Sequence, residues 1–305
     1  MKKIFKVIIF TIIMVLFTNI SVFSKNNYND YDIMVKQDLL CLMLAYSDYI
    51  KDVYKDEHGF IYLVTRSNRK ILYDDKNVKS DEEKLNSPDL QDMLEDVYSL
   101  ESIDCVVEDG KNPGRIRVYS LLNEVYGYSE INVENNLETI LTPYGPISFN
   151  GQNGAARALK SALETAKSYE KEQNSKIIQF VLPIMGTFNY RYIQGTGRLS
   201  PHSFGIAIDL NKSNSDYWKW ARKDDATKRI ASYPKELVKA FEDNGFVWGG
   251  KWAKFDILHF EYRPEIILKA RYFGENTKSL EKPWYLDVPL DDKTNEIINK
   301  IDQLF

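Results

Sequence analysis

The spacing of apolar positions along the chain predicts three main helices. Residues 35–50 carry leucines at helical spacing and are expected to form a buried helix. Residues 151–171 are rich in alanine, contain no proline and repeat their apolar positions at the same interval, which predicts a second helix. A third is expected over 234–245, where Pro234 lies in the first turn and Gly245 ends the helix.

Short strands are predicted between these helices. β-branched and aromatic residues are concentrated over 60–64, 71–73 and 177–182. Residues 74–92 are charged and poor in apolar side chains, so we expect an exposed loop that leads into a helix near 90–98. Because helices and strands alternate without a regular βαβ period, the pattern favours an α+β fold. We expect a small antiparallel sheet that carries the functional site, with helices packed on its other face.

The first 24 residues have the layout of a secretory signal. A cationic start that includes Lys6 precedes an apolar run over 7–17, and compact residues end at Ser24, where cleavage is expected. The run is shorter than the roughly 20 residues that span a bilayer. An uncleaved N-terminal anchor is the alternative, and it is the only membrane association that the sequence suggests.

The net charge argues against one class of partner, whereas the cysteines leave the interpretation open. Loss of residues 1–24 would remove three lysines and no acid, so the net charge of −4 would fall to −7. An acidic chain of this kind argues against nucleic acid as a partner, because phosphate binding needs a basic surface. Cys41 and Cys105 both lie among apolar neighbours, and the sequence leaves open whether they form a disulfide or remain two buried thiols.

Two of the three histidines lie beside carboxylates in short apolar segments. His202 precedes Asp209 by seven residues, a separation that would put them on opposite faces of a continuous strand. We therefore expect a turn or bulge at Gly205, followed by a small strand that ends at Asp209. With His259 from a second segment, these side chains would form the three-ligand set of a catalytic zinc site, in which a fourth position remains for water.

Asp256 precedes His259 by three residues, close enough to act on such a water without binding the metal. A hydrogen-bonded structural His–Asp pair and a non-haem iron centre are the alternatives. Secretion and the lack of an oxygenase-like barrel pattern favour zinc. The aromatic residues allow two interpretations: Trp248 is expected in the core, whereas Trp218 and Trp252 are alternative candidates for lining a cleft. Glu261 either supports His259 or faces solvent.

Three segments together resemble the M15 metallopeptidases, which are the D-alanyl-D-alanine carboxypeptidases and L-alanyl-D-glutamate endopeptidases of bacteria and phages. The segments are residues 186–209 (GTFNYRYIQGTGRLSPHSFGIAID), 248–252 (WGGKW) and 256–264 (DILHFEYRP). They contain the patterns Ser-x-His-x-x-Gly-x-Ala-x-Asp and acid-x-x-His in the order of that family. The resemblance extends over about residues 110–264 and implies a hedgehog/DD-peptidase-like fold.

The resemblance also implies a role for each matching position. Asp256 takes the place of the catalytic acid–base residue, which is glutamate in many members, and its shorter side chain leaves the exact proton path open. Arg191 and Ser200 match residues that contact substrate, although a surface arginine and a capping serine are the simpler interpretations, and Arg198 competes with Arg191. The implied ligands of Zn²⁺ are His202, Asp209 and His259.

The function expected from these residues is cleavage of peptidoglycan stem peptides by a secreted or cell-envelope zinc peptidase of the D-alanyl-D-alanine carboxypeptidase kind. An L-alanyl-D-glutamate endopeptidase is one alternative, and a non-catalytic peptidoglycan-binding module of the same fold is the other. The presence of Asp256 favours catalysis. The expected division of the chain is a signal peptide over 1–24, a region of unknown role over 25–109, a zinc peptidase domain over 110–274 and a C-terminal tail over 275–305.

Overall fold

The computed structural model describes residues 30–173, 176–274 and 283–305. The predicted signal segment therefore lies outside the described residues, as do residues 275–282 of the predicted tail. Within the described part of the chain, no helix has both the length and the apolar character needed to cross a membrane.

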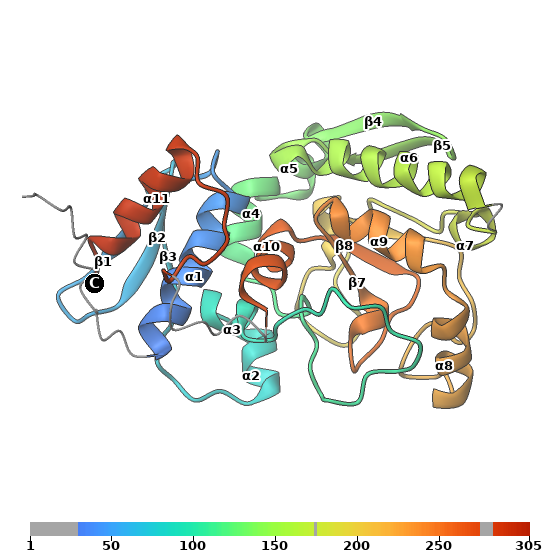
Figure 1. The fold of residues 1–305 in the computed structure, drawn as a ribbon, viewed down its shortest axis with the longest axis horizontal. Helices are drawn as coiled ribbons and strands as arrows, with labels where there is room; N and C mark the ends of the chain where they lie inside the picture. Colours follow the sequence, from blue (N-terminus) through green and yellow to red (C-terminus); the bar gives the residue numbers. More distant parts are fainter. Residues whose placement is uncertain (1–29, 174–175, 275–282) are drawn as a thin grey trace, which may run out of the picture.

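The N-terminal elements form one end of the molecule (Figure 1). Helix α1 (Asp30–Ala45) packs beside an antiparallel sheet of β1 (Ile50–Lys55), β2 (Ile61–Thr65) and β3 (Lys70–Leu72), in the order β1-β2-β3. Two of the strands are those that the apolar pattern predicts, and the helix predicted over 35–50 is present but begins and ends five residues earlier. The last helix, α11 (Asp292–Asp302), contacts both α1 and β1, so part of the predicted tail folds back onto the N-terminal region.

The charged segment over 74–92 is more ordered than expected. It contains α2 (Asp81–Asn86), which starts with a capping box because the Ser80 and Glu83 side chains each bond the other's backbone N–H. The helix expected near 90–98 is the short α3 (Leu90–Leu94), capped in the same way by Asp89. Local capping, which needs no apolar periodicity, explains why this segment forms helix.

The middle of the chain contributes α4 (Tyr119–Tyr126), α5 (Glu130–Asn135) and an unpredicted hairpin of β4 (Leu137–Thr142) and β5 (Gly145–Asn150). After a 3₁₀ turn, η1 (Gln152–Gly154), the predicted alanine-rich helix is present as α6 (Ala155–Gln173). It lies along the hairpin and also contacts α9 (Lys235–Asp243) (Figure 1). Leu159, Ala162 and Leu163 are fully buried, as their spacing predicts.

The strand predicted over 177–182 is wrong. This segment forms the short helix α7 (Ile178–Val181), in which Leu182 N–H donates to the Ile178 carbonyl at 2.9 Å. Ile177 and Val181 are both fully buried, four residues apart, while Ile178 between them is exposed. Burial at helical spacing outweighs the strand preference of β-branched and aromatic residues here.

The second sheet has the order β6-β8-β7, with all neighbours antiparallel. It comprises β6 (Ala207–Asp209), β7 (Phe246–Trp248) and β8 (His259–Tyr262), and α9 packs against β7. Helix α8 (Lys223–Ser232) precedes α9, and two 3₁₀ turns, η2 (Pro201–Phe204) and η3 (Gly249–Lys251), flank the strands. Two small antiparallel sheets and a hairpin among helices confirm the α+β expectation.

One apolar core connects the two ends of the molecule. The ring of Phe241 on α9 lies 4.2 Å from that of Phe260 and 5.3 Å from that of Phe246, between centroids. Helix α10 (Pro264–Phe273) lies between the two sheets and packs against α1 (Figure 1). Both cysteines are free thiols, and Cys105 is exposed, so the expectation of two buried thiols holds only for Cys41.

Candidate metal centre

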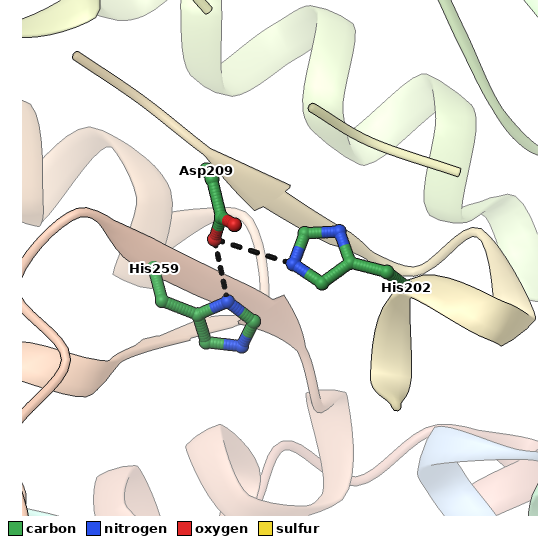
Figure 2. Close-up of side chains that lie close together, drawn as sticks. All are labelled: His202, Asp209 and His259. Carbon is green, nitrogen blue, oxygen red and sulfur yellow. Dashed lines mark hydrogen bonds and ion pairs between the residues drawn. The ribbon is translucent and has the colours of Figure 1, made fainter. Parts of the chain in front are cut away.

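The pairing of β6 with β8 brings two predicted ligands together. Asp209, the last residue of β6, is directly opposite His259, the first residue of β8. Opposite residues of an antiparallel pair point to the same face of the sheet. His259 Nδ1 consequently lies 2.8 Å from Asp209 Oδ1 (Figure 2).

His202 reaches the same carboxylate from the turn η2. Ser200 caps this turn, and its Oγ accepts the N–H of His202 at 3.3 Å. Gly205 then reverses the chain in the left-handed conformation with φ 64°, as predicted between the two ligands. His202 Nε2 lies 3.2 Å from Asp209 Oδ1, so both imidazoles point at one carboxylate (Figure 2).

The donor atoms fit a divalent metal such as zinc. One nitrogen or oxygen from each of His202, Asp209 and His259 lies within 4.8 Å of the others. His202 Nδ1 lies 2.6 Å from the Thr187 carbonyl, which can only accept, so Nδ1 carries the hydrogen and Nε2 is the free ligand atom. Two imidazole nitrogens and a carboxylate form the protein part of many catalytic zinc sites.

The electrostatics of this cluster favour a cation. Burial disfavours the carboxylate of Asp209, but the hydrogen bonds and charges of His202 and His259 outweigh it and hold its pKa well below the usual range. Burial likewise disfavours the imidazolium of His259, yet Asp209 and Glu261 raise its pKa to about 9. The site thus holds excess negative charge that either protons or a metal ion can neutralise.

A second acidic cluster, made of Asp74, Asp75 and Asp89, has a different explanation. The Lys79 ammonium lies 2.9 Å from Asp75 and 2.8 Å from Asp89, and it also reaches Asp92 at 2.6 Å. A lysine already supplies the positive charge there, and histidine takes no part in the cluster.

The backbone of Asp256 is fixed next to His259. Its N–H donates to the Gly249 carbonyl at 2.9 Å, and its own carbonyl accepts the N–H of His259 at 3.1 Å. Burial raises the pKa of Asp256 to about 6, although the charges of His259 and Arg115 act in the opposite direction. A carboxyl group with a pKa in this range can both accept and donate a proton near neutral pH.

Of the other predicted site residues, Arg191 and Ser200 lie at the His202 turn, whereas the Arg198 side chain contacts α2. Arg191 is held there by its backbone, because its N–H donates to Ser203 Oγ at 2.9 Å and its carbonyl accepts from Ser200 at 3.0 Å, while its side chain is exposed. Ser200 is buried and its hydroxyl acts as the cap described above. Arg198 is half-buried and its Nη1 lies 3.4 Å from the Leu85 carbonyl of α2.

The structure also places the tryptophans and the glutamate whose roles the sequence left open. Trp248 is buried and donates from Nε1 to the Ile257 carbonyl at 2.7 Å, as expected for a core residue. Trp252 is buried too, with its ring 5.7 Å from that of His259, so it backs the ligand instead of lining an open cleft. Glu261 is fully buried, and its Oε2 lies 3.8 Å from His259 Nε2.

Two arginines near the site do not stand out in the sequence. Arg115 donates to the Lys254 carbonyl at 2.6 Å, and its guanidinium lies 5.3 Å from the Trp252 ring centre. Arg117 donates to both carboxylate oxygens of Glu261, at 2.8 and 2.5 Å. Their partners lie about 140 residues further along the chain, and no short-range pattern signals such a contact.

Comparison with known families agrees with the resemblance drawn from the motifs. Residues 194–262 match a family described as D-alanyl-D-alanine carboxypeptidase, which is the M15 family that the motifs resemble. The matched segment contains His202, Asp209, Asp256 and His259 and begins three residues after Arg191. No solved structure matches the chain.

Proposed function

We propose that this chain, as a member of the M15 peptidases over residues 194–262, is a zinc-dependent enzyme that cleaves peptidoglycan stem peptides, as a D-alanyl-D-alanine carboxypeptidase does. The observation that carries the proposal is the convergence of two imidazoles and a carboxylate beside Asp256, within the segment that matches the family. We further propose that the β6-β8-β7 sheet and its helices form a hedgehog/DD-peptidase-like fold.

Each residue has a defined part in this chemistry. His202, Asp209 and His259 would hold the zinc, which when bound polarises the scissile carbonyl and makes water a better nucleophile near neutral pH. Asp256 would accept the proton of the attacking water and donate it to the leaving nitrogen. The exposed guanidinium of Arg191 would stabilise the negative charge that develops on the carbonyl oxygen.

The place of action follows from the substrate class. Peptidoglycan lies outside the cytoplasmic membrane, so we propose that the protein is secreted or associated with the cell envelope after removal of residues 1–24. The negative net charge is in keeping with this proposal, since it does not favour nucleic acid as a competing partner.

The direct test uses purified protein with zinc and synthetic stem peptides that end in D-alanyl-D-alanine, with mass spectrometry of the products. Release of one terminal alanine is the expected result. A cut between L-alanine and D-glutamate would instead identify the endopeptidase, and binding without cleavage would identify a binding module. The His202→Ala variant is the control for a contaminating peptidase. The proposal would be refuted if the protein neither bound nor cleaved any of the stem peptides.

A further inference from the structure

A buried ion pair lies directly behind the metal ligand His259. Glu261 follows His259 by two residues on β8, so both side chains point to the same face of the sheet. Glu261 Oε2 lies 3.8 Å from His259 Nε2, an ion-pair distance, and Arg117 holds both carboxylate oxygens.

This pair is the end of a longer chain of buried polar contacts. Arg263, which is fully buried, places Nη1 3.4 Å from Glu261 and Nε 2.7 Å from Glu265. The hydroxyl of Tyr46 donates to Glu265 at 2.6 Å, and Tyr46 directly follows α1. The contacts therefore lead from a metal ligand of the sheet to the N-terminal helix.

Stability alone is a poor explanation for this arrangement. Burying two arginines and two glutamates carries a large desolvation cost, and apolar replacements of such groups are often neutral or stabilising. A metal-binding histidine, in contrast, usually donates its second ring N–H to a carboxylate or carbonyl, which sets its tautomer and ring orientation. The Thr187 carbonyl accepts this hydrogen bond from His202 at 2.6 Å, and Glu261, with Oε2 at the longer distance of 3.8 Å from Nε2, is the carboxylate that faces the corresponding nitrogen of His259.

We infer that Glu261, held by Arg117, is a positioning residue that turns Nδ1 of His259 towards the metal. Arg263 extends this support to Tyr46, so residues before 110 are part of the scaffold of the metal centre and not an independent module. The inference rests on the proposed zinc site, but it requires no particular substrate.

The first test measures zinc affinity by competition with a chromophoric chelator. Glu261→Gln keeps the shape of the side chain and removes its charge, and Arg117→Lys keeps the charge and loses the two-pronged contact. Each should weaken zinc binding by about 10–100-fold, the usual effect of losing such a partner. Folded variants with the affinity of the parent would overturn the inference. If Arg117→Lys does not fold, Glu261→Gln alone decides.

A matched pair of tyrosine variants tests the extension to α1. Tyr46→Phe should weaken zinc binding by about 2–10-fold, because it removes the hydrogen bond to Glu265 and so affects Glu261 only indirectly, through Arg263. Tyr98 is also fully buried and donates to a buried glutamate, Glu242, which pairs with Lys251 at 2.6 Å. Tyr98→Phe should leave zinc affinity unchanged. Equal effects of the two variants would mean that general loosening, and not positioning, controls the site.

Nitrogen-15 spectra of the imidazoles distinguish positioning from a purely structural role of Glu261, because loss of a purely structural residue would not change them. The chain contains three histidines, so the signals can be assigned by substitution. In the zinc-loaded parent, His259 should carry its hydrogen on Nε2, with slow exchange that becomes fast in Glu261→Gln. If stem peptides are not cleaved but these zinc effects appear, the proposed function fails and the positioning role stands. If the parent binds no zinc, both fail.

Discussion

Replacement of Asp256 by alanine should remove catalysis while making the metal-free protein more stable. Burial raises the pKa of Asp256 from 3.8 to about 6. Each pKa unit corresponds to about 1.36 kcal/mol, so the ionised carboxylate lowers the unfolding free energy by about 3 kcal/mol at neutral pH. The sign follows because the folded protein binds this proton more tightly, so stability is lost as pH rises towards 6. The backbone contacts to Gly249 and His259 remain in the alanine variant.

The same substitution removes the proton acceptor and donor of the reaction. General acid–base groups contribute about 10²–10⁴-fold, so kcat should fall by this factor, which corresponds to about 3–5 kcal/mol of activation free energy. Zinc should remain bound, because His202, Asp209 and His259 are unchanged. Asp256→Glu should retain much of the rate, since the similar peptidases often have glutamate at this position.

Three measurements check this prediction: hydrolysis of a stem peptide at saturating zinc, zinc affinity by chelator competition, and urea unfolding in the presence of a chelator. Asp224→Ala, at an exposed position in α8, is the control and should resemble the parent in all three. A parental kcat in Asp256→Ala would refute the assigned mechanism. Loss of zinc would make Asp256 a ligand and would require another role for Asp209.

The remaining predictions concern the ligands, the pH dependence and the turn. His202→Ala and His259→Ala should each lose zinc at stoichiometric concentration, as measured by metal analysis after gel filtration, and full occupancy in both would place the ligands elsewhere. The kcat/KM should rise with pH, because Asp256 must ionise to accept a proton. The apparent pKa of this rise should be at or below about 6, since bound zinc lowers the pKa of Asp256. A flat profile across the acidic range would contradict this. Gly205→Ala should lower the unfolding free energy by about 1–2 kcal/mol, because φ is 64° and an added Cβ would lie 2.7 Å from Leu137, and an unchanged urea midpoint would argue against strain there.

Apolar periodicity predicted the elements that bury one clear face. Helices α6 and α9 match their predicted segments to within four residues because each repeats apolar positions over several turns, whereas α1 begins and ends five residues before its predicted segment. The prediction failed over 177–182, where a strand-like composition occupies a single helical turn. The hairpin of β4 and β5 was missed because no position of β4 is buried, and in β5 only Ile147, Phe149 and Asn150 are, so neither strand has a clear alternation.

What the sequence alone determined about the site is the identity of the three residues that cluster there and the turn between two of them. His202, Gly205 and Asp209 lie within eight residues, so local geometry and donor chemistry sufficed. Only the tertiary structure decided what surrounds them: the Thr187 carbonyl behind His202, and Arg117 with Glu261 behind His259. These contacts depend on strand register and on the packing of α1 against α10, which are set by burial summed over the whole core and leave no short-range signature in the sequence.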